Sequence, residues 1–419
     1  MRILHTSDWH LGRNLEGRSR LPEQEQFMDE LAAIVKEEDI QAILVAGDVF
    51  DTYNPSADAE NLFYDGLERL SENGKRAVVA IAGNHDSPDR LHAANPLALK
   101  HGISLLGYPR EQLTVGMSPG GVGRIGAGPG WVELTTSGSN EKAVVYALPY
   151  PSESRLNEVL SEKLDEASGQ VAYSERVGGL FSEADQTFRP DTVNLVVAHL
   201  FVRGGGESES ERQLGGALAV APQAMPKKAH YIALGHLHRP QQVNHTPQTC
   251  RYSGSPLSFS FAEADQQKEV LIVDVIPGGL AKARAINLSC GKALKRWRAS
   301  SVAEAGLWLT EPSNLEAWVE LEIMADQPLE VAELAELRKA HSGIITIRPI
   351  FPELDADDAA LRKLSEIPLV DRFKLFFERE KGIAPPEDLV NFFLEMVNRP
   401  ESDDNSNLDA TKATGGEVA

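Results

Sequence analysis

The chain has 419 residues and a formal net charge of −21 at pH 7. This length exceeds the roughly 250–300 residues at which a single core stops growing, so we expect more than one domain. The acidic total argues against broad affinity for nucleic acid, but a metal site would add local positive charge and keep a nucleic-acid enzyme open. No apolar run approaches the roughly 20 residues of a membrane span, so we expect a cytoplasmic protein without a membrane partner. The two cysteines, Cys250 and Cys290, are too few for a disulfide framework, although one pair is possible.

Short apolar runs alternate with amphipathic helical patterns in the first half of the chain. Apolar side chains recur at helical spacing in 22–38 and in 57–73, which predicts two helices with one buried face each. Alternation of strands and helices is typical of a layered α/β core. The expected strands cover 2–5, 42–46, 77–81 and 103–106.

Further strands and three more segments are expected along the rest of the chain. The strands cover 124–125, 143–148, 193–198, 231–234 and 269–275, and they complete a catalytic domain of residues 1–285. After the Pro-Gly-Gly turn at 277–279 the pattern restarts as strand 318–324, helix 329–340 and strand 344–350. These elements predict a small β-α-β cap domain at 286–352. Helices 369–381 and 386–398 predict a helical segment at 353–400, and the polar end at 401–419 is expected to be disordered.

Residue types that bind metals follow five of the predicted strands. Sites in open α/β sheets form beyond the carboxyl ends of the strands, so these loops should converge. Neutral imidazoles, carboxylates and one amide oxygen form mixed shells for manganese, iron or zinc. The candidate ligands are Asp8, His10, Asp48, Asn84, His199, His236 and His238.

Each motif taken alone has a more ordinary explanation. Asp8-x-His10 by itself is most often a surface loop, Asn84 a turn former, and His199 a hydrogen-bonded core residue. Their succession after apolar strand patterns favours a shared metal site. Two divalent ions about 3.5–4 Å apart can activate a water as nucleophile and neutralise charge on a phosphoryl group. We therefore expect a two-metal phosphoesterase.

The order of these motifs resembles the calcineurin-like metallophosphoesterase family, with its pattern D-x-H, G-D, G-N-H-D, H and G-H-x-H. The resemblance implies a four-layer α/β sandwich. It also implies that His85 lies near the scissile phosphate and assists its orientation or protonates the leaving group, and that Asp86 fixes the turn or His85. His85 could instead serve only to orient the residues that bind the metals. One metal would be held by Asp8, His10 and His238, the other by Asn84, His199 and His236, with Asp48 bridging them.

The residues around the motifs resemble a narrower family, SbcD, which supplies the nuclease of bacterial SbcCD complexes. The matching stretches are LHTSDWHLGR, AGDVFD, GNHDSP, the 205–216 loop, GHLHRPQ and YSGSP. The resemblance implies a manganese-dependent nuclease of DNA repair, replication and recombination. Its substrates would be double-stranded DNA ends, hairpins and single-stranded DNA, and its partner the SbcC ATPase.

That family also implies a homodimer within a heterotetramer, paired through helices at 57–73 and 88–99. The side chains considered for this contact, which could equally belong to the chain's own core, are Leu62, Phe63, Leu91 and Leu97. The C-terminal helices are unusually apolar and could bind the ATPase or pack on the cap domain. The residues concerned are Phe373, Leu375, Phe376, Phe377, Leu389, Phe392, Phe393 and Met396. Two other functions stay open, a phosphoesterase of nucleotides or other small phosphoesters and a non-enzymatic scaffold.

Overall fold

The computed structural model describes residues 1–137, 141–158, 166–206 and 218–351, with a few positions between 370 and 390. The chain divides into two compact units, Met1–Ile350 and Phe351–Ala419. Most of the loop at 205–216, most of the two predicted C-terminal helices and the whole tail at 401–419 lie outside the described residues. None of the helices in the described part of the chain has the length and hydropathy that a membrane span requires.

A six-stranded sheet contains all four strands predicted in the first half of the chain, in the order β16-β15-β1-β4-β5-β6. The four strands β1, β4, β5 and β6 run parallel, β15 pairs antiparallel with β1, and β16 pairs antiparallel with β15. Helices α1 and α2 bury Phe27, Leu31, Phe63 and Leu67 in the core on the outer face of this sheet. The bounds are β1 (Arg2–Thr6), β4 (Ala42–Val45), β5 (Ala77–Ile81), β6 (Ile103–Leu106), β15 (Glu269–Asp274), β16 (Lys282–Asn287), α1 (Leu21–Glu37) and α2 (Ala57–Ser71).

A second sheet has eight strands in the order β13-β14-β12-β11-β10-β9-β8-β7. Its parallel centre consists of β10, β11, β12 and β14. Helix α6 packs on its outer face through Tyr173, Val177 and Phe181. The bounds are β7 (Gly116–Met117), β8 (Gly123–Gly128), β9 (Trp131–Thr135), β10 (Lys142–Leu148), β11 (Val193–His199), β12 (Tyr231–Gly235), β13 (Gln241–Gln242), β14 (Thr249–Tyr252) and α6 (Glu166–Thr187).

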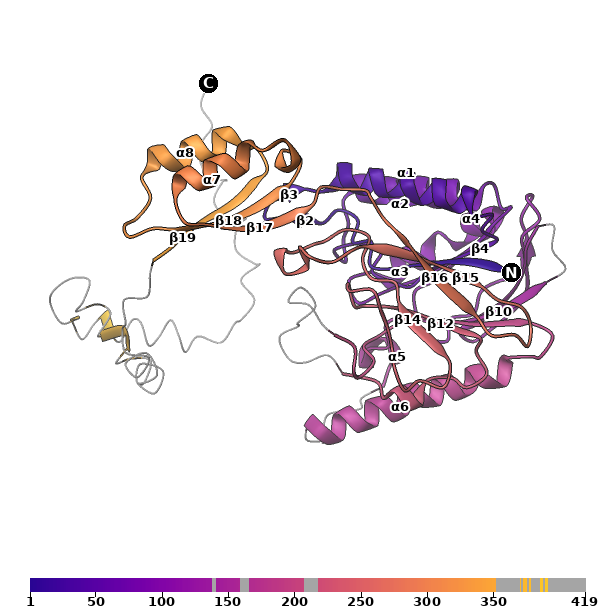
Figure 1. Cartoon of the computed structure of the whole chain (residues 1–419). Coiled ribbons are helices and arrows are strands. Elements are labelled where there is room, and N and C mark those ends of the chain that lie inside the picture. The colour runs from indigo at the N-terminus through magenta and orange to yellow at the C-terminus, as the bar shows by residue number, and fades with distance from the viewer. Residues whose placement is uncertain are drawn as a thin grey trace, which may run out of the picture. The chain divides into compact units, whose positions relative to one another are not determined.

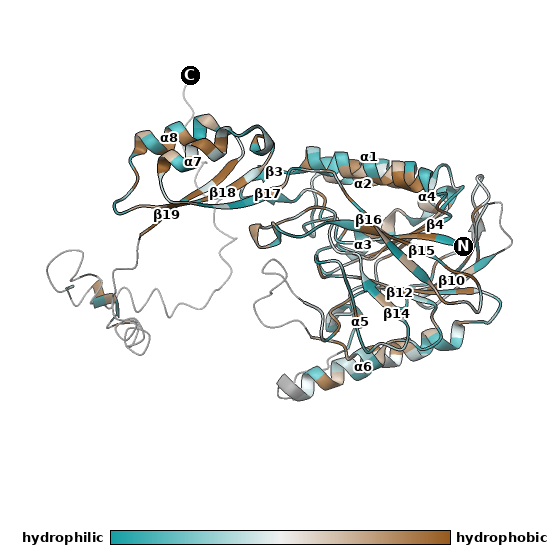
Figure 2. Ribbon diagram, viewed as in Figure 1, coloured by the Kyte–Doolittle hydropathy of each residue, from teal (hydrophilic) through white to brown (hydrophobic). Residues whose placement is uncertain are grey.

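The two sheets face each other across a shared apolar core. Ile3, Leu44 and Val79 of the first sheet meet Val145 and Val197 of the second. The result is the expected four-layer arrangement, with α1 and α2 on one side and α6 on the other (Figure 1). Both α1 and α6 carry polar as well as apolar residues, as helices do when one face packs on a sheet and the other is exposed (Figure 2). Cys250 and Cys290 are free thiols in separate cores.

Residues 294–350 form a three-stranded parallel sheet with two helices and a core of their own. The strand, helix and strand predicted here are present, and β17 and α7 precede them without having been predicted. The alternating basic residues of β17 explain why it was missed, because Arg296 and Arg298 pair with Glu320 and Glu322 on the polar face. The bounds are β17 (Leu294–Ala299), α7 (Val302–Thr310), β18 (Trp318–Met324), α8 (Val331–Ala340) and β19 (Ile344–Ile350).

The helix predicted at 88–99 is broken into α3 (Pro88–Ala93), α4 (Asn95–Ala98) and the 3-10 turn η1 (Leu99–His101). Phe63 and Leu91, considered as dimer contacts, lie in the chain's own core, whereas Leu97 is 68% exposed. Leu62 is partly buried against the same core. The remaining short elements are β2 (Asn14–Leu15), β3 (Arg18–Ser19), α5 (Glu153–Leu156), η2 (Pro222–Ala224), η3 (Phe261–Glu263) and η4 (Pro312–Asn314).

Candidate metal centre

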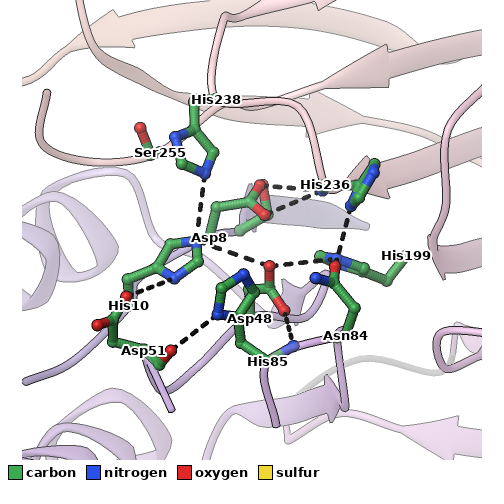
Figure 3. A network of polar contacts seen from close by, with 12 residues as sticks. Asp8, His10, Asp48, Asp51, Asn84, His85, His199, His236, His238 and Ser255 are labelled. Carbon is green, nitrogen blue, oxygen red and sulfur yellow. Dashed lines mark hydrogen bonds and ion pairs between the residues drawn. The ribbon is translucent and has the colours of Figure 1, made fainter. Parts of the chain in front are cut away.

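Loops at the carboxyl ends of β1, β4, β5, β11 and β12 converge at one point between the two sheets. The amide of Asp8 donates to the carbonyl of Gly47, and the amide of His10 donates to the carbonyl of Asp48. These hydrogen bonds hold the first two loops side by side. The structure thus brings together all of the predicted ligands, as Figure 3 shows: Asp8, His10, Asp48, Asn84, His199, His236 and His238.

One half of the centre consists of Asp8, His10 and His238, whose donor atoms lie within 4.8 Å of one another. The Nε2 atoms of His10 and His238 are 3.2 Å apart. All three residues are buried. This half contains the three residues that the family resemblance assigns to one metal.

The other half consists of His199, His236 and Asn84. The Asn84 Oδ1 atom lies 2.9 Å from His199 Nε2 and 3.0 Å from His236 Nδ1. Asp48 stands between the halves, because its Oδ2 atom is 3.4 Å from His199 Nε2 and 3.6 Å from His10 Nε2. One carboxylate therefore faces both groups of ligands.

The hydrogen-bonding pattern leaves lone pairs pointing inward. His199 Nδ1 lies 2.8 Å from the carbonyl oxygen of Ala46, which can only accept, so the ring keeps its proton there. In the neutral ring, Nε2 then holds a lone pair that faces the oxygens of Asn84 and Asp48. These acceptors need a cation among them, either a proton on Nε2, whose pKa is raised to about 9, or a metal ion in its place. The donor set therefore fits a divalent metal.

The pKa shifts in the centre indicate the same need for positive charge. Burial raises the pKa of the Asp8 carboxyl to about 8, although His199 opposes the shift. Burial would lower the pKa of His199, but Asp48 and Asp8 raise it to about 9. Burial lowers the pKa of His236 to about 3, so that ring is neutral and able to coordinate.

The loops adopt backbone conformations that few side chains tolerate. Asp8, His10 and Asp48 have φ of 54°, 44° and 48°, in the left-handed region, and His236 has φ of 105°. Such conformations occur where function requires them and the surrounding structure enforces them. A side chain at Gly83 would place its Cβ 2.1 Å from Asp48 Oδ1, so only glycine permits the β5 loop to approach the β4 loop.

Asp86 ties these two loops together, in keeping with the expectation that it fixes the turn. Its carboxylate accepts from the amides of Val49, Phe50 and Gly83, at 3.1, 2.8 and 2.8 Å. Asp86 is not placed to bind a metal, because both of its carboxylate oxygens accept hydrogen bonds from these amides. The result is a rigid support beneath Asp48 and Asn84.

His85 lies at the edge of the centre and is only half-buried. Its amide donates to Asp48 Oδ1 at 2.9 Å, and its Nδ1 donates to the carbonyl of Asp51 at 2.8 Å. Its ring packs edge-on against His10, with centroids 4.8 Å apart. Nε2 is therefore the nitrogen left to interact with a substrate.

Sequence reasoning missed two acidic residues of the centre. Glu263 accepts from His238 Nδ1 at 3.1 Å and from Lys268 Nζ at 2.6 Å, and it is fully buried. Asp51 lies within ligand distance of His10 and His85. Asp51 had a local signal, because it follows Asp48 closely in the same loop. Glu263 had none, because it comes from a turn 25 residues beyond His238.

Comparison with known proteins agrees with this geometry. A family model described as calcineurin-like phosphoesterase matches residues 1–240. A protein of Bacillus subtilis (strain 168), named as the SbcD component of nuclease SbcCD, is 46% identical over 408 residues, covering 96% of this chain and 100% of that protein. Its namesake from Rhodobacter capsulatus is 35% identical over 283 residues, covering 66% of this chain and 67% of that protein. Among solved structures, GAP50 of Plasmodium matches 70% of this chain and 91% of its own at 12% identity, with a TM-score of only 0.36.

Proposed function

Because the chain belongs to the calcineurin-like phosphoesterases and, within them, to the SbcD family of nucleases, we propose that it hydrolyses DNA phosphodiester bonds with two divalent ions. The observation that carries the proposal is the pair of ligand groups on either side of Asp48. The substrates we propose are double-stranded ends, hairpins and single strands of DNA, in repair, replication and recombination.

The ligand assignment of this proposal follows the two halves of the centre. Asp8, His10 and His238 would hold one ion, and Asn84, His199 and His236 the other. Asp48 would contact both, since its Oδ2 faces His10 and His199 at similar distances. Manganese suits such a mixed shell of imidazole, carboxylate and amide ligands, and we propose it as the working metal.

When bound there, two divalent ions supply Lewis acidity that lowers the pKa of water and neutralises charge on the phosphoryl group. The protein residues supply the positioning. His85 Nε2 is free for a phosphate oxygen or the leaving-group oxygen, because Nδ1 is occupied by Asp51. The amide bond from His85 to Asp48 fixes the distance between the ring and the bridging carboxylate. His85 would thus orient the phosphate or protonate the leaving group.

Two substitutions test the mechanism. With manganese, the purified protein should cleave end-labelled linear duplex DNA and bis-p-nitrophenyl phosphate, and nucleoside monophosphates much more slowly. Asp48→Ala should abolish most cleavage because both ions lose a shared ligand. His85→Gln should slow cleavage by about 10²–10⁴-fold while manganese still binds.

His245→Gln is the matched control, because His245 is exposed and lies outside the centre. Its rate should equal that of the wild type. Near-normal rates for Asp48→Ala and His85→Gln would refute the mechanism. Rapid cleavage of monophosphates with none of DNA would instead favour the small-substrate phosphoesterase.

We also propose that an SbcC-type ATPase binds the segment at 353–400, and that two copies of the nuclease pair as a homodimer within a heterotetramer. The first proposal rests on the apolar sequence of that segment. Within its few described positions, the rings of Phe373 and Phe377 are 6.2 Å apart, as neighbours on one helix face would be. Deleting 368–419 should abolish ATPase binding, measured by co-purification, and leave cleavage of bis-p-nitrophenyl phosphate intact. Retained binding would contradict the assignment.

A further inference from the structure

A pocket of about 370 Å³ lies directly beside the metal centre. We call it the tyrosine pocket, after Tyr53, Tyr108 and Tyr150, and its wall also includes Asn84, Pro88 and Arg155. These residues come from the segments after β4, β5, β6 and β10, including the first residue of α3 and one residue of α5. Its volume falls in the range of roughly 300–1,000 Å³ that is typical of small-ligand sites.

The tyrosine pocket and the metal centre share a wall. Asn84 lines the pocket while its Oδ1 atom faces His199 and His236. The Tyr150 ring stacks on His236, with centroids 6.1 Å apart and an interplanar angle of 26°. The pocket is therefore within reach of an ester arm of a phosphodiester held at the centre.

The walls of the pocket are held by the same loop that carries Asn84. Arg155 Nη1 and Nη2 donate to the carbonyls of Gly83 and Asp86, both at 2.7 Å. The amide of Tyr150 donates to the carbonyl of Ala82 at 2.9 Å. The Tyr108 hydroxyl donates to Asp89 at 2.8 Å. The pocket is therefore preorganised relative to the centre, and binding costs little ordering of these side chains.

The chemistry of the pocket differs from that of the surface nearby. None of the described residues that line it carries a carboxylate, although the chain has a net charge of −21. By contrast, a groove between α1 and α2 has four carboxylates against one cation, Arg69, in its lining: Glu25, Asp29, Asp58 and Asp65. An anionic substrate can approach the tyrosine pocket, whereas the carboxylates of the groove between α1 and α2 repel it.

Aromatic rings with a nearby guanidinium are the groups that bind nucleobases in single strands. The Arg155 guanidinium lies 5.7 Å from the centroid of the Tyr150 ring, which leaves the rings of Tyr53 and Tyr108 as stacking surfaces. Tyr53 is 53% exposed, so its ring is accessible from solvent. We propose that the tyrosine pocket binds the nucleobase of a nucleotide next to the scissile phosphodiester, stacked against Tyr53 and Tyr108.

This inference rests on the proposed nuclease activity and adds a base-binding subsite to it. A base within a duplex is stacked and paired, so the pocket can take a base only from a single strand or a frayed end. Stacking does not depend on which base is present. The subsite should therefore distinguish an intact nucleotide from an abasic one, but show little preference for sequence.

The experiment uses the full chain with manganese and short end-labelled single strands, some with one abasic nucleotide at a defined position. The cleavage rate of each bond is read from product lengths. For the wild type, an abasic nucleotide should slow cleavage of an adjacent bond by at least about fivefold. Tyr53→Ala and Tyr108→Ala should slow cleavage next to intact nucleotides by a similar factor and no longer discriminate against the abasic one.

Tyr53→Phe is the matched control, since it keeps the ring and loses only the hydroxyl, and Tyr108→Phe keeps the ring but also loses the hydrogen bond to Asp89. Both should retain the wild-type discrimination, all variants should keep the manganese affinity, and the Tyr53 variants should keep the melting temperature of the wild type. If the alanine variants discriminate as the wild type does, or if the wild type is indifferent to abasic nucleotides, the subsite is refuted while the nuclease stands. If the wild type cleaves no strand with any divalent metal, both proposals fail together.

Discussion

Glu263 shows how one residue remote in sequence sets the orientation of His238, a proposed metal ligand. It accepts from His238 Nδ1, which turns Nε2 of that ring toward His10 and the centre. Burial alone would raise its pKa, but His238 and Lys268 hold the pKa of the Glu263 carboxyl well below its usual range. The carboxylate is therefore ionised and fixes the tautomer of the histidine.

Glu263→Gln should weaken manganese binding by about 10–100-fold, because the amide holds His238 less firmly and makes it a poorer electron donor. Isothermal titration of the metal-free protein with manganese measures this directly. Glu30→Gln is the control, since Glu30 accepts from Ser289 and Cys290, outside the centre. Equal affinities for the two variants, with melting temperatures alike, would remove the role assigned to Glu263.

At the scale of elements, the centre depends on how closely the β4 and β5 loops pack. Asp86 joins them through three amides, and Arg155 joins the β5 loop to the segment after β10. Gly83 is the point of closest approach, because its missing Cβ leaves room for Asp48. The packing of two loops thus sets the position of Asp48, the proposed bridging carboxylate.

Gly83→Ala should destabilise the fold by about 1–3 kcal/mol and lower manganese affinity, because the new methyl group displaces Asp48. Gly306→Ala is the contrasting control, since no atom lies within 4 Å of the position a Cβ would take in α7. That change should raise stability by about 0.5–1 kcal/mol. Denaturant-induced unfolding measures the stability of both variants, and titration with manganese measures their metal affinity. If the Gly83→Ala protein had the stability and the manganese affinity of the wild type, the two loops would not need to pack this closely.

At the scale of the whole molecule, an apolar groove on α2, α3 and α4 bears on the proposed dimer. Tyr64, Leu67, Ala94, Leu97 and Ala98 are among its lining residues, and its volume is about 590 Å³. Leu97 and Tyr64 are 68% and 43% exposed. Exposed apolar groups gathered at one groove are typical of an interaction surface.

Leu97→Asp should dissociate the proposed dimer, because the interface would then bury an unpaired carboxylate. Analytical ultracentrifugation over a range of concentrations gives the oligomeric state. Leu307→Asp is the control, since Leu307 is an equally exposed leucine on α7, away from the groove. Cleavage of bis-p-nitrophenyl phosphate should persist in both variants. A monomeric wild type, or a Leu97→Asp protein that still pairs, would argue against this surface.

Local sequence patterns were enough to predict most strands of the two sheets and the loops that form the candidate site. The strands β1, β4, β5, β6, β11 and β12 follow from short apolar runs that end in Gly, Asp, Asn or His. Because parallel strands present their carboxyl ends at one edge, those runs also indicated which loops would meet. Helix α6 was not predicted, since Gly178 and Gly179 lie within it and only packing on the second sheet offsets their low helix propensity.

The tertiary structure alone decided the rest, because contacts between distant segments leave no local pattern. The sequence by itself determined the α/β layers and the set of candidate ligands. Only the fold placed Glu263 behind His238, assigned Phe63 and Leu91 to the core, and set the tyrosine pocket beside Asn84. The physical reason is that periodicity records which face of an element is buried, whereas the partner on that face depends on how the two sheets and their loops pack together.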